Sequence, residues 1–118
     1  MERTVTINGR EMRMRASALI PRLYRRYFCR DIVTDMRQLQ KAYDKAKTDE
    51  DEQLSALDLT IFENIAWVML KHGGEDVGIS PDAWLDSIEG VFSVYEIMPV
   101  VLELWQYNGI TTAKPKKP

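Results

Sequence analysis

The stretch that decides the fold is residues 54–72, LSALDLTIFENIAWVMLKH, the most apolar segment of the chain. Apolar side chains recur there at helical spacing, and additional ones widen the stripe beyond the single face of a surface helix. We therefore expect a helix over residues 54–72 at the centre of the core. Gly73 and Gly74 follow directly and predict its end, because glycine adopts C-cap conformations at low cost.

Two helices and a hairpin are predicted before this segment. Pro21 suits the first turn of a helix over about residues 18–29, and the apolar spacing from Ile32 onward indicates a second helix over about 31–46. Earlier in the chain, Asn8-Gly9 favours a type I′ turn between two short alternating segments. They predict a β-hairpin over residues 4–15, which has to pack on helices because an isolated hairpin is marginally stable.

Two shorter helices are predicted after the central segment. Ser80-Pro81 is typical of an N-cap followed by proline, and predicts a helix over about residues 81–89. Ser93 begins an S-x-x-E capping box, which predicts a helix over about residues 94–107.

Together these elements predict one α+β, mostly helical domain over residues 1–109 of the 118-residue chain. Its N-terminal β-hairpin packs on a bundle of about four to five helices, and the polar residues 110–118 form a flexible tail. No apolar run approaches the ~20 residues of a membrane span, and the N-terminus lacks the pattern of a secretory signal. We therefore expect a cytoplasmic protein.

The net charge of −2 conceals a strong asymmetry along the chain. Residues 1–47 contain 12 Lys and Arg against 5 Asp and Glu, whereas residues 48–109 contain 13 Asp and Glu and only one basic residue, Lys71. Such polarity has three possible consequences: steering of a charged partner, head-to-tail self-association, or pairing of the two parts within the fold.

Residues suited to catalysis or metal binding are few. His72 is the only histidine, and at the end of its predicted helix a cationic imidazole would complement the helix dipole. Cys29 is the only cysteine and lies just beyond an apolar helix face, where packing is its commoner role. No glycine-rich phosphate motif is present, and the acidic run at residues 49–52 lacks the spacing of a calcium loop. We predict no enzymatic activity, no cofactor and no metal site.

The arginines of the first predicted helix raise the alternative of nucleic-acid binding. Arg22, Arg25, Arg26 and Arg30 are interleaved with tyrosines, as in surfaces that contact phosphates. However, the sequence pI of about 5.4 argues against a nucleic-acid-binding domain, and pairing with the acidic part of the chain also explains the arginines.

Segments spread in order over nearly the whole chain carry a family resemblance. They are residues 7–11 (INGRE), 21–25 (PRLYR), 28 (F), 30–32 (RDI), 62–69 (FENIAWVM), 84–86 (WLD), 92–97 (FSVYEI) and 102–105 (LELW). In these segments the chain resembles the tail assembly chaperones of long-tailed phages and prophages of Gram-positive bacteria. It departs from them at Cys29, where the family is expected to have a glycine.

The resemblance implies a binding function in tail morphogenesis. Such chaperones associate with the tape-measure protein, recruit tail-tube subunits, and are absent from the mature virion. For this chain the resemblance implies action in the cytoplasm of a bacterial host cell, with self-association or a frameshift-extended form as further possibilities. The alternatives are a structural virion or head–tail completion protein and a small DNA-binding regulator.

A helical tape measure with exposed apolar stripes would dock in an apolar groove at i, i+3, i+4 and i+7 spacing. We predict such a groove along the first helix and the last, with arginines at its rim. The candidate partner-binding residues are Leu23, Tyr24, Arg25, Tyr27, Phe28 and Trp105. The alternative is that these side chains fill the core of the chain itself.

Overall fold

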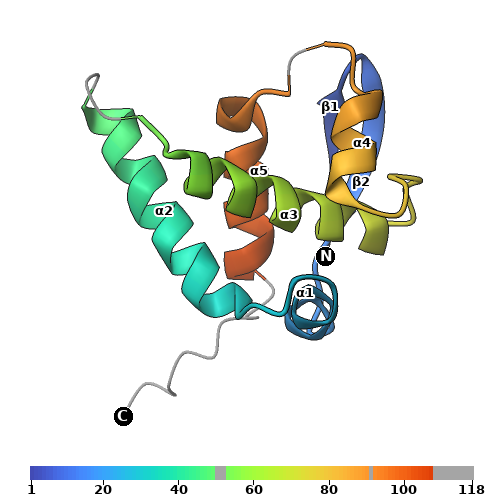
Figure 1. The fold of residues 1–118 in the computed structure, drawn as a ribbon, viewed down its shortest axis with the longest axis horizontal. Coiled ribbons are helices and arrows are strands. Elements are labelled where there is room, and N and C mark those ends of the chain that lie inside the picture. The colour runs from blue at the N-terminus through green and yellow to red at the C-terminus, as the bar shows by residue number, and fades with distance from the viewer. Residues whose placement is uncertain (50–52, 91, 108–118) are drawn as a thin grey trace.

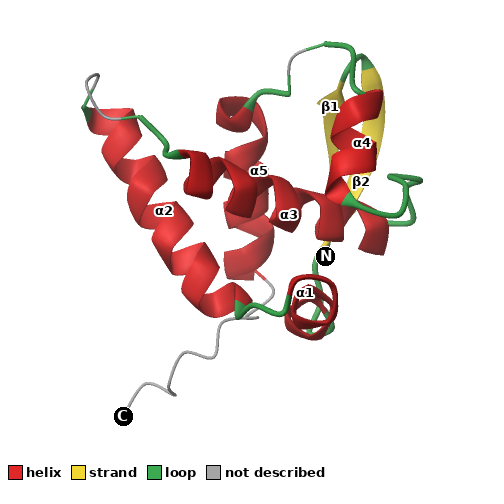
Figure 2. Ribbon diagram, viewed as in Figure 1, coloured by secondary structure: helices red, strands yellow, loops and turns green. Residues whose placement is uncertain are grey.

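The computed structural model of the protein describes residues 1–49, 53–90 and 92–107, which form two strands and five helices. Along the chain these are β1 (Glu2–Ile7), β2 (Arg10–Arg15), α1 (Ile20–Phe28), α2 (Ile32–Thr48), α3 (Ala56–His72), α4 (Pro81–Ser87) and α5 (Val94–Tyr107). The predicted α+β, mostly helical fold with an N-terminal hairpin is confirmed (Figure 2). Every predicted helix is present, with each end within two residues of its predicted place. The predicted tail, residues 110–118, lies outside the described residues.

The hairpin has the predicted Asn8-Gly9 turn. Both residues have positive φ, 53° and 78°, as a type I′ turn requires. The strands pair antiparallel with Val5 opposite Met12, which sets a single apolar face. Its buried side chains are Val5, Ile7, Met12 and Met14. This face is covered because β2 packs against α3 and β1 against α5.

Helix α3 lies at the centre of the molecule (Figure 1). It packs against β2, α1, α2, α4 and α5. Apolar side chains on several sides of the helix are consequently buried, among them Ile61, Ile65, Trp67 and Leu70. The prediction of a core helix that is wider than one apolar face is confirmed.

The two ends of α3 are fixed by different means. At its start Ser55 and Asp58 form a reciprocal capping box, with Ser55 Oγ accepting from the Asp58 N–H at 3.0 Å. At its end Gly73 lies so close to β2 that a Cβ there would be 2.3 Å from the carbonyl oxygen of Arg13. Gly74 then turns the chain with φ of 89°. Glycine at position 73 thus permits the close approach of α3 to the hairpin.

Helix α5 completes the core by packing on α3 and β1. At its surface Arg3 Nη2 donates to Glu103 Oε1 at 2.6 Å, which ties β1 to α5. Among the helices of the described residues, none has the length and apolar character needed to cross a membrane.

Candidate protein-binding surface

Helix α1 is short and held against the rest of the molecule on one side. Pro21 occupies its first turn, where the missing N–H leaves no helix bond unmade. Ile20 and Tyr24 are fully buried against the core, and the helix packs on α3 and α2. At its end Cys29 adopts a left-handed conformation, φ 55°, and donates its N–H to the Arg25 carbonyl at 2.8 Å. One face of α1 is therefore anchored and another is free.

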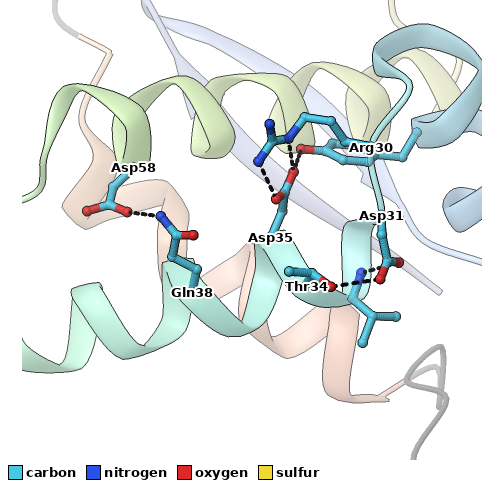
Figure 3. Close-up of polar contacts among 8 residues, drawn as sticks. Arg30, Asp31, Thr34, Asp35, Gln38 and Asp58 are labelled. Atoms are coloured by element: carbon cyan, nitrogen blue, oxygen red, sulfur yellow. Dashed lines mark hydrogen bonds and ion pairs between the residues drawn. The ribbon is translucent and has the colours of Figure 1, made fainter.

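The anchor is a buried polar network between α1 and α2. Tyr24 donates its hydroxyl to Asp35 Oδ2 at 2.7 Å. Arg30 donates two hydrogen bonds to the same carboxylate, from Nε to Oδ2 at 2.7 Å and from Nη2 to Oδ1 at 2.8 Å (Figure 3). The charge of Asp35 is thereby paired and hydrogen-bonded, as a buried carboxylate requires.

The pKa values of this network follow from burial and pairing. Burial raises the pKa of Tyr24 well above its usual range, and the neighbouring carboxylate of Asp35 raises it further. For Asp35, burial works toward a higher pKa, but the hydrogen bonds from Arg30 and Tyr24 outweigh it and leave the pKa below its ordinary value. Tyr24 is thus a neutral donor to a charged acceptor, and its role is structural.

The free face of α1 carries an apolar stripe with one-turn spacing, Leu19, Leu23 and Tyr27, here named the α1 shelf. Leu19 and Tyr27 are 43% and 42% exposed, and Leu23 is half-buried. Together with Val68, Lys71 and His72 of α3, the shelf lines an open pocket of about 240 Å³. The Tyr27 ring meets the Trp67 ring edge-on at 4.9 Å, so the shelf rests on the buried centre of α3.

Two arginines border the α1 shelf along its length. Arg22 follows Leu19 by three residues and Arg26 follows Leu23 by three, which makes each a neighbour of a shelf residue on the helix surface. We call this pair the cationic rim. Both side chains, like that of Arg25, are exposed, and they have no ion-pair partner in the part of the chain that the structure describes. Their charge is therefore available to an external acidic partner.

Other basic residues of the first 47 positions do pair across the fold. Arg3 binds Glu103, and Arg13 Nε lies 3.8 Å from Glu75 Oε2, so two ion pairs join the basic part of the chain to the acidic part. Pairing within the fold accounts for Arg3 and Arg13, whereas the cationic rim has no such pairing within residues 1–49, 53–90 and 92–107.

The predicted partner-binding residues divide into two groups. Tyr24 and Trp105 belong to the core, with exposures of 0% and 4%, and Trp105 lies on α5, which packs on α3 and β1. A groove that needs both of these side chains at its surface is not open in this structure. By contrast Leu23, Arg25 and Tyr27 are accessible on α1, while Phe28 is half-buried against the Tyr24 ring at 5.0 Å.

The shelf and the pocket that it lines also include residues that were not predicted. Leu19 continues the Leu23–Tyr27 spacing by one turn toward the N-terminus, so its place was recoverable from the sequence. Val68 and Lys71 come from α3, and only the packing of α1 on α3 brings them to the pocket.

His72 and Cys29 both differ from expectation. Nε2 of His72 lies 2.8 Å from Ser17 Oγ. Burial lowers the His72 pKa from its ordinary 6.5, and the charges of Arg15 and the N-terminal ammonium lower it further. A lowered pKa disfavours the cationic imidazole that the sequence led us to expect at the end of α3. Cys29 is exposed instead of packed, because it occupies the left-handed end of α1.

A second hollow of about 520 Å³ lies between α2 and α5. Its lining mixes charges of both signs, Asp44, Lys47 and Glu103, around Leu102 and Pro99. Because these charges are mixed and Glu103 already binds Arg3, this hollow is less suited to an apolar helix face than the α1 shelf is. Within residues 1–49, 53–90 and 92–107, no group of three or more His, Cys, Asp or Glu side chains is placed to hold a metal ion.

Comparison with protein-family models, with curated proteins and with solved structures finds no match to this chain.

Proposed function

We propose that this protein is a tail assembly chaperone of a long-tailed phage or prophage, which binds the tape-measure protein and recruits tail-tube subunits to it. The observation that carries the proposal is the α1 shelf: an exposed apolar stripe at helical spacing, bordered by the cationic rim, which has no ion-pair partner among the residues that the structure describes. Such a surface suits the apolar face of a partner helix. On this proposal the chain acts in the cytoplasm of the host without catalysis, and it leaves before the virion is complete.

The physical reason for such a function is the aggregation of exposed apolar stripes. A long helical tape measure would expose apolar side chains until the tube encloses it, and large exposed apolar patches associate. The shelf would cover one such stripe, while Arg22 and Arg26 would attract acidic residues beside it. Charges at a rim of this kind act mainly on the association rate and on partner choice.

The test is co-expression of the chain with the tape-measure protein encoded in the same genome. We expect the tape measure to stay soluble and to co-purify with the wild-type chain. The double variant Leu23→Ser/Tyr27→Ser should lose this complex, because both substitutions remove apolar contact area from the shelf.

The matched control is Leu57→Ser, which alters a side chain that is 50% exposed at the opposite end of α3. This variant should keep the complex. Circular dichroism of each variant verifies that it is folded. Precipitation of the tape measure with the folded wild-type chain, or equal capture by the shelf variant, would contradict the proposal.

The cationic rim is also the observation that favours the DNA-binding alternative. That function predicts salt-dependent retention of duplex DNA, lost in Arg22→Gln/Arg26→Gln. The other alternative, a structural virion or head–tail completion protein, predicts that the chain is found by mass spectrometry in purified particles. Absence from particles together with no retention of DNA leaves the chaperone proposal standing.

A further inference from the structure

The loop between α3 and α4 presents the most exposed large apolar side chain among the described residues. Ile79 is 89% exposed. Its position is fixed from several sides: the buried Trp67 donates its indole N–H to the Val77 carbonyl at 3.0 Å, and Lys71 Nζ donates to the Gly78 carbonyl at 3.4 Å. Asp76 accepts from the Gly78 N–H at 3.3 Å. These bonds hold the chain just before Ile79, which reduces the conformational entropy that docking of this side chain would cost.

This loop and the pocket beside the α1 shelf lie close together on the molecule. Lys71 links them, because its side chain lines the pocket and its Nζ reaches the loop at Gly78. The pocket has a volume of about 240 Å³ and apolar walls from Leu19, Leu23 and Val68, so it has room for one aliphatic side chain. An apolar projection and an apolar recess therefore share one region of the surface.

Acidic residues flank the projection in the sequence and arginines border the recess, with Lys71 lying between the two features. Asp76 and Asp82 flank Ile79 on either side in the sequence, and both are exposed. The recess is bordered by the cationic rim, Arg22 and Arg26, which has no ion-pair partner among the described residues. Complementary charges across a contact favour encounter and correct registration of two surfaces.

We propose that two copies of this chain associate as a symmetric dimer, in which Ile79 of each copy inserts into the recess beside the α1 shelf of the other. A two-fold axis makes the contact reciprocal, since the projection and the recess lie in the same region of each copy. In the dimer Asp76 and Asp82 of one copy meet Arg22 and Arg26 of the other. The dimer covers the shelf and therefore competes with any partner that binds there.

The dimer is tested by sedimentation velocity of the full chain over a concentration series from about 10 μM to 1 mM. High concentrations are included because a contact made by one apolar side chain and its flanking charges is expected to be transient. We expect the sedimentation coefficient to rise with concentration. Ile79→Ser should raise the dissociation constant at least about tenfold, as truncation of a central apolar anchor does. The control is Leu57→Ser, which removes an exposed apolar side chain far from the proposed contact and should leave the dissociation constant unchanged.

A charge-reversal experiment tests the reciprocal arrangement. One variant carries Arg22→Glu/Arg26→Glu, and the other carries Asp76→Arg/Asp82→Arg. Each alone places like charges at both contacts and should sediment as a monomer, whereas an equimolar mixture places opposite charges at both contacts and should form a heterodimer.

A wild-type chain that is monomeric throughout the series would overturn the proposal. So would a dimer that survives Ile79→Ser, or a mixture of the charge-reversed variants that remains monomeric. These outcomes are separate from those for the proposed chaperone function, because Ile79→Ser leaves the α1 shelf intact. That variant should capture the tape measure at least as well as the wild-type chain does.

Discussion

Cys29 ends α1 in a backbone conformation that suits glycine. Its φ of 55° is left-handed, which costs a residue with a Cβ about 1–2 kcal/mol. We predict that Cys29→Gly raises the free energy of unfolding by about 0.5–1 kcal/mol, because relief of this strain outweighs the greater entropy that glycine loses on folding. Urea unfolding should show a higher midpoint at unchanged slope. Cys29→Ala removes the thiol but keeps the Cβ, so an equal gain in that variant would attribute the effect to the thiol.

Asp35 makes the stability of the fold depend on pH. Its folded pKa lies below the ordinary 3.8, because Arg30 and Tyr24 stabilise the charged form against the effect of burial. A carboxyl group of this kind stabilises the fold above its unfolded pKa, and the stabilisation is lost as the pH falls through the folded value. We predict that the free energy of unfolding declines between about pH 5 and pH 2, and that Asp35→Asn makes this decline shallower.

The measurement is urea unfolding at several pH values within that window. Asp86→Asn, at an exposed position on α4, is the matched control and should keep the wild-type decline. An equally steep decline in Asp35→Asn would mean that the bonds from Arg30 and Tyr24 do not stabilise the carboxylate.

At the residue scale, the sequence predicts which side chains form an apolar stripe better than it predicts which of them are buried. Tyr24 and Tyr27 lie on one apolar stripe, but α2 and α3 cover only part of it. Tyr24 is therefore buried and hydrogen-bonded to Asp35, whereas Tyr27 remains 42% exposed. The lowering of the His72 pKa could not be predicted either, since it depends on burial and on Arg15, which is distant in the chain. By contrast, residue 29 has a left-handed φ, which suits glycine, the residue that the resemblance led us to expect at this position.

At the scale of elements, the junction of α3 with the hairpin depends on the absence of a side chain at Gly73. Its φ is −76°, which any residue can adopt, so the cost of a substitution there is purely steric. We predict that Gly73→Ala destabilises the fold by about 2–3 kcal/mol, because a Cβ would lie 2.3 Å from a backbone oxygen of β2. Thermal unfolding followed by circular dichroism measures the loss.

Gly74→Ala provides the contrasting case. A Cβ at this position would meet only the end of the Arg13 side chain at 3.6 Å, but the φ of 89° is strained for alanine. We expect a smaller loss of about 1 kcal/mol. If the two variants lose the same stability, the close approach of Gly73 to Arg13 is not what fixes the hairpin on α3.

The elements themselves were largely predictable because their signals are local. Asn8-Gly9 sets the hairpin turn, and Ser80-Pro81 begins α4 where an N-cap and a first-turn proline belong. The start of α3 at Ala56 was placed two residues early, because Ser55 and Asp58 form a capping box with Asp in the position that more often holds Glu. The contact of Gly73 with Arg13 was not predictable, since nothing local indicates which strand a glycine will face.

For the whole molecule, the central place of α3 predicts a single cooperative unfolding transition. Ile65 is completely buried on this helix. Ile65→Ala should lower the free energy of unfolding by about 2–4 kcal/mol, as truncation of a buried aliphatic side chain does. Far-UV circular dichroism and tryptophan fluorescence should still give coincident transitions. Leu57→Ala, at an exposed position of the same helix, should cost less than about 1 kcal/mol.

Separate transitions in the two signals would contradict the central role of α3 in the fold. That role could be predicted from the width of the apolar stripe in residues 54–72. The arrangement of the other helices around it could not, and so the sequence did not indicate that Trp105 is buried where α5 packs on α3 and β1. Binding of a tape-measure protein stays a prediction.

The contact between Arg13 and Glu75 can form only after a delay during synthesis of the chain. The two residues are 62 positions apart, so the hairpin leaves the ribosome well before the end of α3, on which it packs. At about 5–20 residues per second, the delay is roughly 3–12 s. The apolar face of Val5, Ile7, Met12 and Met14 has no α3 to cover it during that interval, and a lone hairpin is marginally stable. The hairpin is therefore translated before α3 but reaches its final structure only after α3 has been made.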